Sequence, residues 1–132
     1  MGRMRHVLGE RGQALVEFAL VIPILVLVVI AIIQFGTAYE TYLRLTDAVR
    51  VGGRAAATQA NGPAACSAGR AAATTNWSGG TYTCTWQNVT ISGATGQDPA
   101  AMVTGQAPYS INIIGVQVFS GTFTTSSEER LG

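Results

Sequence analysis

An apolar run near the N-terminus constrains this chain more than any other feature. It extends from Ala14 to Ile33, twenty residues interrupted only by Glu17 and Pro23. A helix of twenty residues spans about 30 Å, the thickness of the hydrocarbon core of a bilayer. A cleaved secretory signal is the alternative, but its apolar core is shorter, about 7–15 residues, and small residues follow it at the cleavage site. The residues after this run make a poor cleavage site, so we expect a transmembrane helix over residues 13–34.

The arginines that flank this run indicate its orientation. Arg3, Arg5 and Arg11 precede it closely, whereas the first arginine after it is Arg44, eleven residues beyond its end. The cytoplasmic flanks of membrane helices carry an excess of basic residues. We therefore expect a single-pass protein with a cytoplasmic N-terminal segment, residues 1–12, and a C-terminal head on the outer side of the membrane.

The helix is expected to continue outside the membrane over residues 35–58. Apolar residues recur there mostly at spacings of three and four, the pattern of a helix with one apolar stripe. Glu40 and Arg44 stand four positions apart, in the favourable order for a helical ion pair. The Asn-Gly-Pro sequence that begins at Asn61 carries helix-ending residues. A single helix over residues 13–58 would be about 69 Å long.

The composition changes after this helix. Residues 59–80 are rich in alanine, serine, threonine and glycine, which predicts a linker with room for one short helix around Cys66–Ala73. From Thr81 onward, aromatic and other β-favouring residues alternate with threonines, the pattern of a strand. About fifty residues of β structure make too small a core to be stable alone. We therefore expect an α+β fold in which a small antiparallel β-sheet, within residues 81–132, packs on the exposed half of the helix.

Three segments of this head have residue patterns that predict their local structure. Glycine, proline and aspartate residues predict a loop over Gly93–Pro108. The segment Tyr109–Phe123 has many apolar residues, with two glycines that mark kinks, and predicts either one long bent strand or a hairpin. The polar tail from Ser126 onward is expected to be loose.

The chain has two cysteines, Cys66 and Cys84. Their spacing is not that of a metal site, and the only histidine, His6, lies near the N-terminus, far from both. A cysteine pair on the C-terminal side of the anchor favours one disulfide, Cys66–Cys84, in an oxidising compartment. Two buried free thiols are the alternative. We expect no metal site.

Charge and residue types argue against a nucleic-acid-binding protein and against an enzyme. Only 11% of the residues are charged, the net charge is +1, and all eight basic residues are arginine. Nucleic-acid-binding proteins show a clustered basic stripe, and a chain without lysine has no Schiff-base or phosphate-loop chemistry. The enzymatic alternative is a hydrolase that pairs Asp98 with Glu128 or Glu129, on expected loops without a visible apolar pocket. We expect no catalytic residue, no cofactor and no small-molecule substrate.

Glu17 is the anomaly of the apolar run, because a carboxylate in a membrane span is costly and marks a candidate functional site by default. It follows Gly12 by five positions and precedes Phe18, and a basic stretch comes before the glycine. This arrangement resembles the processing site of type IV prepilins, in which a membrane-embedded aspartic peptidase cuts after the glycine. The resemblance implies cleavage between Gly12 and Gln13, with Glu17 as the fifth residue of the mature chain.

A longer stretch carries a second resemblance. It reads RGQALVEFALVIPILVLVVIAIIQFG and, further on, LTDAVRVGGRAAA, over about residues 10–58. In this stretch the chain resembles the TadE family, the pseudopilin-type minor proteins of tight-adherence (Flp) pilus systems. Pro23 stands in the family's usual proline position, and Arg50 and Arg54 fall in its post-membrane segment. Val51-Gly52 departs from the family, in which an acidic residue usually precedes the glycine.

The resemblance implies a structural component of pilus assembly, held in the cytoplasmic (inner) membrane and found at the cell surface after assembly. Its implied partners are the prepilin peptidase, other pilin or pseudopilin subunits, the Tad secretion machinery and membrane lipids. In a filament, Glu17 would pair with the new N-terminal amine of a neighbour's Gln13, a pair that sets register more than it adds stability. Pro23 would kink the helix or release backbone groups locally. The alternative is an unprocessed, single-span membrane-anchored adhesin or binding domain.

Overall fold

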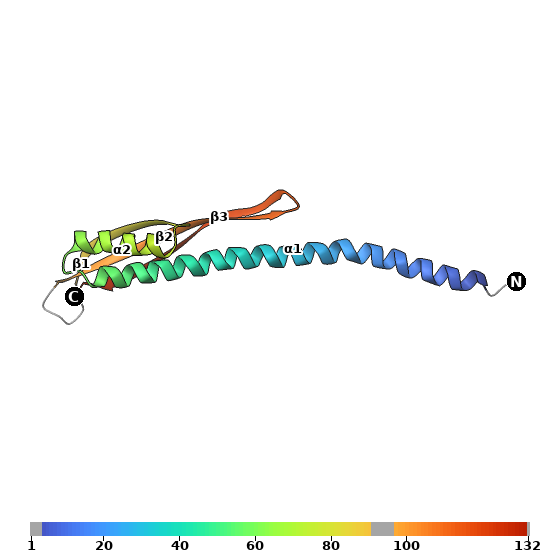
Figure 1. Cartoon of the computed structure of the whole chain (residues 1–132), viewed down its shortest axis with the longest axis horizontal. Helices are drawn as coiled ribbons and strands as arrows, with labels where there is room; N and C mark the ends of the chain where they lie inside the picture. Colours follow the sequence, from blue (N-terminus) through green and yellow to red (C-terminus); the bar gives the residue numbers. More distant parts are fainter. Residues whose placement is uncertain (1–3, 91–96, 132) are drawn as a thin grey trace.

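The computed structural model describes residues 4–90 and 97–131, with side chains over residues 12–88 and 99–131. The described chain forms two helices and three strands: α1 (Met4–Ala57), α2 (Gly62–Asn76), β1 (Thr81–Thr90), β2 (Gln97–Ile113) and β3 (Val116–Arg130). Figure 1 shows α2 and the sheet beside the C-terminal part of α1, while the N-terminal part of α1 projects away from them. The expected α+β fold, with a small antiparallel sheet packed on a long helix, is confirmed.

α1 is longer than expected at its N-terminal end. It begins at Met4 and runs without a break to Ala57, so part of the segment before Gln13 is helical too. Pro23 lies inside the helix, and α1 continues past it with only gentle curvature (Figure 1). The anchor, the expected extension beyond it and part of the N-terminal segment thus form one rod.

The segment expected as a linker, residues 59–80, contains the short helix expected around Cys66–Ala73, but α2 is longer than that and occupies most of the segment. The local sequence sets the first turn of α2. The Asn61 side chain accepts a hydrogen bond of 2.8 Å from the backbone N–H of Ala64, and Pro63 stands in the first turn, where a helix needs no N–H donor. The buried positions of α2 are all small residues: Gly62, Ala65, Gly69 and Ala73.

Two buried glycines let α1 and α2 approach closely. A Cβ built on Gly52 of α1 would lie 2.7 Å from the carbonyl oxygen of Gly69. A Cβ built on Gly69 would lie 3.0 Å from the carbonyl oxygen of Gly52. Any larger residue at either position would push the helices apart, so these glycines set how closely the two helices pack.

The sheet is antiparallel with strand order β1-β2-β3. β1 pairs only with the first part of β2, and its pairing ends where Thr81 faces Gln106. From Ala107, which faces Phe123, to the turn at Ile114-Gly115, β2 pairs with β3 alone. This part of the sheet is a two-stranded hairpin, so the hairpin alternative for Tyr109–Phe123 is correct.

The loop expected over Gly93–Pro108 is wrong from Gln97 onward, because these residues belong to β2. Residues 91–96 lie outside the described part of the chain. Gly105 contributes to the turn signal in the sequence but serves packing instead: a Cβ there would lie 2.5 Å from Cγ2 of Val49 on α1. The glycine lets the helix lie against the middle of the strand.

The expectation of a loose C-terminal tail is also wrong. β3 continues through Ser126 to Arg130, which pairs with Ala100. Threonine, serine and glutamate residues dominate this end of the strand, and their backbone groups pair with β2. Leu131 is buried, and its backbone N–H donates to the carbonyl oxygen of Pro99 at 2.9 Å.

The core lies between α2, the sheet and the C-terminal part of α1. It is built mainly from alanines and a few larger side chains, in two clusters: Leu45, Ala48, Val49, Ala73, Tyr82 and Ala107, then Ala56, Ala65, Ala101, Val103 and Leu131. On the outer face of α1, Arg44 Nη2 lies 2.6 Å from Glu40 Oε1, which confirms the expected ion pair. The head covers the C-terminal part of the apolar stripe, from Leu45 to Ala56, whereas Phe35 and Tyr39 at its start are exposed.

Candidate functional site

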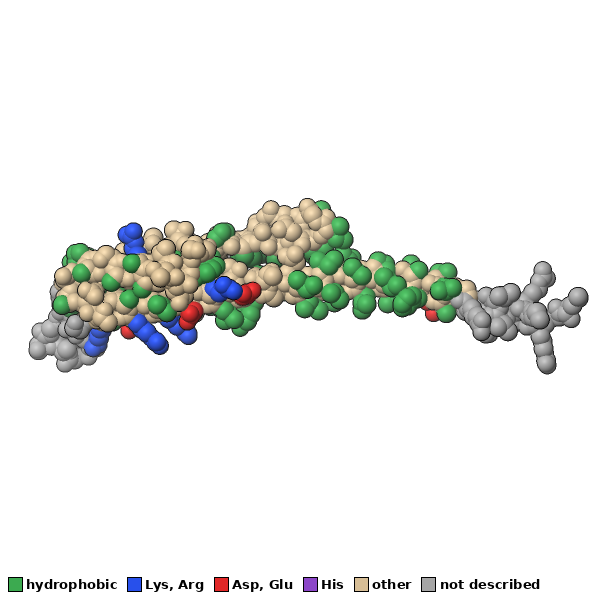
Figure 2. Space-filling view, viewed as in Figure 1, with side chains coloured by type: hydrophobic (Ala, Val, Ile, Leu, Met, Phe, Trp, Pro, Cys, Tyr) green, Lys and Arg blue, Asp and Glu red, His purple; other side chains and the backbone are tan. Residues whose placement is uncertain are grey.

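The N-terminal part of α1 presents its apolar side chains to the surroundings with no cover from the rest of the chain. Its most apolar 18-residue stretch is long enough to cross a membrane, and none of that stretch is buried. Leu15, Phe18 and Ile24 each have more than 60% of their surface exposed. Figure 2 shows hydrophobic side chains along this part of the helix. Such a surface is stable only in lipid or against other apolar helices, so α1 indicates membrane anchoring.

Glu17 interrupts this apolar surface. It is exposed, and it is the only charged residue between Arg11 and Glu40. Its Oε1 accepts a hydrogen bond of 3.3 Å from Nε2 of Gln13, one turn earlier on the same face of α1. The residue that a prepilin-type cut would make N-terminal therefore already lies beside the carboxylate.

Gly12 lies inside α1 without any packing constraint. A Cβ built on it would meet no atom within 4 Å. The folded chain would therefore accept a larger residue here, and a glycine inside a helix is less stable than alanine by about 1 kcal/mol. The side chains of the arginines before it lie outside the described part of the chain.

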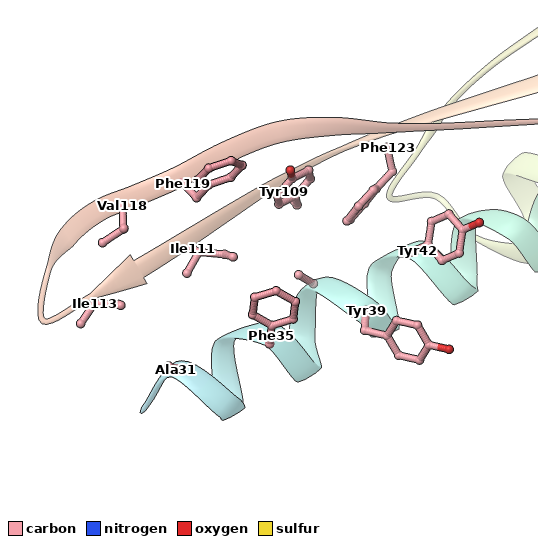
Figure 3. Close-up of a pocket in the computed structure, with 11 residues that line it drawn as sticks. Ala31, Phe35, Tyr39, Tyr42, Tyr109, Ile111, Ile113, Val118, Phe119 and Phe123 are labelled. Atoms are coloured by element: carbon pink, nitrogen blue, oxygen red, sulfur yellow. The ribbon is translucent and has the colours of Figure 1, made fainter. Parts of the chain in front are cut away.

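An apolar groove lies between α1 and the β2–β3 hairpin, where α1 leaves the apolar run (Figure 3). Its volume is about 700 Å³. Phe123 closes one end, stacked on Tyr109 at a centroid distance of 4.2 Å and in edge contact with Tyr42 at 5.5 Å. The lining side chains are all apolar or aromatic: Ala31, Phe35, Ala38, Tyr39, Tyr42, Tyr109, Ile111, Ile113, Val118, Phe119 and Phe123.

The sequence interpretation did not find this groove. It assigned the apolar residues of the hairpin to a core that packs on the helix, yet Val118 and Phe119 are more than half exposed. The signal that could have indicated the groove is the lack of any charged residue over Tyr109–Phe123. The structure shows the reason for the difference: the hairpin stands off from α1 instead of packing on it.

The carboxylates of the enzymatic alternative do not form a described site. The side chain of Asp98 lies outside the described part of the chain. Glu128 and Glu129 are neighbours on β3 and therefore point to opposite faces of the sheet. Among the described side chains, no three histidine, cysteine, aspartate or glutamate residues gather as metal ligands would.

Two further features hold the head together. Cys66 of α2 and Cys84 of β1 form a disulfide with their Cα atoms 5.3 Å apart. Nearby, the hydroxyl of Tyr82 donates a hydrogen bond of 2.8 Å to the backbone carbonyl of Trp77. Burial raises the pKa of Tyr82 above 10.0, because a phenolate would lose its hydration there.

Comparison with known families addresses the N-terminal segment. The model of the TadE-like protein family matches residues 12–54. This segment is TadE-like. The match confirms the resemblance to the TadE family and covers the apolar run, Glu17, Pro23 and Arg50. It supports a role related to the Tad pilus in general terms. No curated protein and no solved structure matches the chain.

Proposed function

We propose that this chain is a minor pilin, or pseudopilin, of tight-adherence pilus assembly, a non-catalytic subunit that prepilin peptidase matures after Gly12. One observation carries the proposal: α1 is a single rod whose TadE-like N-terminal part is apolar and uncovered, while its C-terminal part carries a folded head. Such a rod can exchange one apolar environment for another, from lipid to a bundle of neighbouring helices.

In the membrane stage, α1 anchors the subunit in the cytoplasmic membrane with its N-terminus in the cytoplasm. The basic residues before Gly12 favour this orientation. The head then lies in an oxidising compartment, in which the Cys66–Cys84 disulfide is stable.

Maturation takes place at the glycine. The open space around Gly12 supports this step, because no contact within the described chain explains a glycine there. A cut after it would turn Gln13 into an N-terminal residue with a charged amine. Prepilin peptidase is the partner that this step requires.

In the assembly stage, the apolar face of α1 packs against other pilin or pseudopilin helices. Glu17 then loses its access to water, and the amine of a neighbour's Gln13 is the partner that neutralises it. Pro23 lacks the N–H that would bond one turn back, which leaves a point in this part of the rod that can bend during extraction.

Pilus recovery from a strain that lacks only this chain tests the proposal. We expect pili to be lost or greatly reduced and to return when the wild-type chain is supplied from a plasmid. Normal pili without the chain would contradict the proposal and favour the alternative of an unprocessed, membrane-anchored binding domain. N-terminal sequencing of the plasmid-borne protein checks the maturation step separately.

A further inference from the structure

The turn of the β2–β3 hairpin contains a residue type that is unfavourable for the backbone conformation of the turn. Ile114 has a φ of 51° and Gly115 a φ of 77°. A two-residue hairpin turn with positive φ at both positions prefers Asn-Gly, and a β-branched residue in this conformation is an outlier. Ile114 is also 74% exposed, so no core contact within the described chain compensates for the unfavourable conformation. A strained, exposed, apolar residue of this kind marks a candidate contact surface.

The hairpin runs beside α1, and its turn is the end nearer to the membrane-spanning part of α1. Phe123 contacts Tyr42 at one end of the groove, while Ala31 and Ile113 line the other end (Figure 3). Ala31 belongs to the apolar run, and Ile114 directly follows Ile113. The turn therefore lies level with the last residues of the run that would sit in lipid.

The surface around the turn is apolar and uncharged. We define the hairpin tip as residues 113–119. Four of its large apolar side chains are more than half exposed: Ile114, Val116, Val118 and Phe119. Figure 2 shows the charged side chains of the head gathered at the other end, away from this tip. Such a distribution fits a molecule whose charged end stays in water and whose hairpin tip does not.

We propose that the hairpin tip inserts into the membrane leaflet from which α1 emerges, and that lipid acyl chains fill the groove between them. This inference rests on the membrane anchoring in the proposed function. The groove is continuous with the membrane-spanning surface, since Ala31 belongs to both and Phe35 follows the run two positions after its end. The lipid that surrounds the span therefore has direct access to the groove.

The depth of insertion is limited by the backbone. A two-stranded hairpin exposes unpaired N–H and C=O groups along its outer edges, which hydrocarbon does not tolerate. Gln117 in the tip is exposed and polar as well. Tyr39, Tyr42 and Tyr109 line the groove, and tyrosines favour the level of the headgroups. The tip therefore lies at the boundary between headgroups and acyl chains, and the head is held against the membrane at two points.

Photo-crosslinking from the tip tests this contact. The full chain is produced with the photoreactive residue p-benzoylphenylalanine in place of Phe119 and reconstituted into vesicles of phosphatidylethanolamine and phosphatidylglycerol. A matched sample carries the same residue in place of Thr124, which is exposed on β3 farther from the turn. Flotation first confirms that both chains are anchored, and mass spectrometry after illumination then identifies the adducts. We expect a phospholipid adduct at position 119 and a several-fold lower yield at position 124.

The variant Ile114→Asn is designed to weaken the membrane contact of the tip while leaving the hairpin folded. Asparagine suits the turn conformation and removes the apolar side chain, so the hairpin should keep its thermal stability or gain some. We expect the lipid adduct at position 119 to fall several-fold in this variant. Equal lipid yields at both positions, an adduct with a second copy of the chain in place of lipid, or a yield unchanged by Ile114→Asn would overturn the inference. A chain that fails to float would overturn the anchoring itself and the inference with it.

Discussion

Gln13 Nε2 donates a hydrogen bond to Glu17 Oε1 across one turn of α1, with the two atoms 3.3 Å apart. The two residues therefore share one face of a helix that is otherwise apolar from Ala14 to Ile33. A cut after Gly12 would place a positive amine on that same face. The residue that would become N-terminal thus lies one turn from the carboxylate on its own helix, and in a filament we assign Glu17 to the amine of a neighbour's Gln13 instead.

Glu17→Ala is expected to abolish incorporation into pili without preventing membrane insertion. Removal of a charge from the span eases insertion, by at most the roughly 3 kcal/mol that a charge costs at the centre of a span. In the filament, the neighbour's amine would then be buried without a partner, which costs about 3–5 kcal/mol. Pilus recovery at equal protein level measures the effect, and Glu17→Gln should show a partial loss, since an amide still accepts a hydrogen bond.

Glu40→Ala is the matched control for this carboxylate. Glu40 also lies on α1, but its ion pair with Arg44 is more than half exposed on both sides and contributes at most about 1 kcal/mol. We expect normal pili with this variant. Normal pili with Glu17→Ala as well would mean that Glu17 is an ordinary interfacial residue.

Gly12→Leu is expected to block maturation, because a bulky side chain cannot enter a peptidase site that accepts a bare backbone. The chain itself tolerates the change, since no atom lies within 4 Å of the Cβ position. Gly36→Leu is the control, as Gly36 is equally open within the same helix. Intact-mass measurement should show the full-length chain for Gly12→Leu and a chain beginning at Gln13 for the control and the wild type. A wild-type chain that keeps Met1 in cells with the peptidase would refute the maturation step.

The Cys66–Cys84 disulfide is expected to form in the envelope and to stabilise the head. The bridge spans 18 positions of the sequence, for which loop entropy gives about 3 kcal/mol. Alkylation without reduction should leave both cysteines unmodified, as mass spectrometry would show. The double variant Cys66→Ser/Cys84→Ser should melt at a lower temperature than Ser67→Ala, which changes an exposed neighbour on α2. Two alkylated thiols in fresh envelopes would contradict both the bridge and the topology.

Gly52→Ala is expected to destabilise the head by about 1–3 kcal/mol, the usual effect of overpacking a tight core. The added methyl group would meet the Gly69 carbonyl oxygen at 2.7 Å, and a backbone atom cannot move aside cheaply. Gly36→Ala should not destabilise the chain, because its position is open and alanine favours a helix. Thermal melting of the detergent-solubilised proteins compares the two. A Gly52→Ala variant as stable as Gly36→Ala would show that the helices can separate without loss.

Tyr82 is expected to make the head sensitive to alkaline pH. Its pKa is raised above 10.0 in the folded chain, so its contribution is fully present below pH 10.0 and is lost as the pH rises through the folded-state pKa, because the unfolded chain ionises first. Tyr82→Phe should show a weaker decline of melting temperature above pH 10.0, although it loses the hydrogen bond to Trp77. Tyr39→Phe, a change at an exposed tyrosine, should keep the wild-type decline.

The sequence predicted the parts of this fold that depend on local pattern. The length of the apolar run and the regular spacing of Leu45, Ala48 and Val49 determine one long helix, and that helix was predicted almost to its C-terminal residue. Segments whose residues have weak or misleading preferences were predicted only in part. After Gly62, the alanines, serines and threonines indicate a linker with one short helix, and α2 extends beyond that helix at both ends. Gly105 was assigned to a loop, because glycine signals a turn and a close helix contact equally well.

By itself, the sequence determined the membrane-length helix and the TadE-like character of residues 12–54, and it led to the proposal of a prepilin-type site at Gly12 and Glu17. These properties depend on residues close together in the chain. Only the tertiary structure decided that Gly52 meets Gly69, and that the hairpin tip lies level with Ala31 beside an open groove. Those relationships join residues far apart in sequence, and their geometry follows from how closely glycines and alanines let helices and strands pack, which no local pattern encodes.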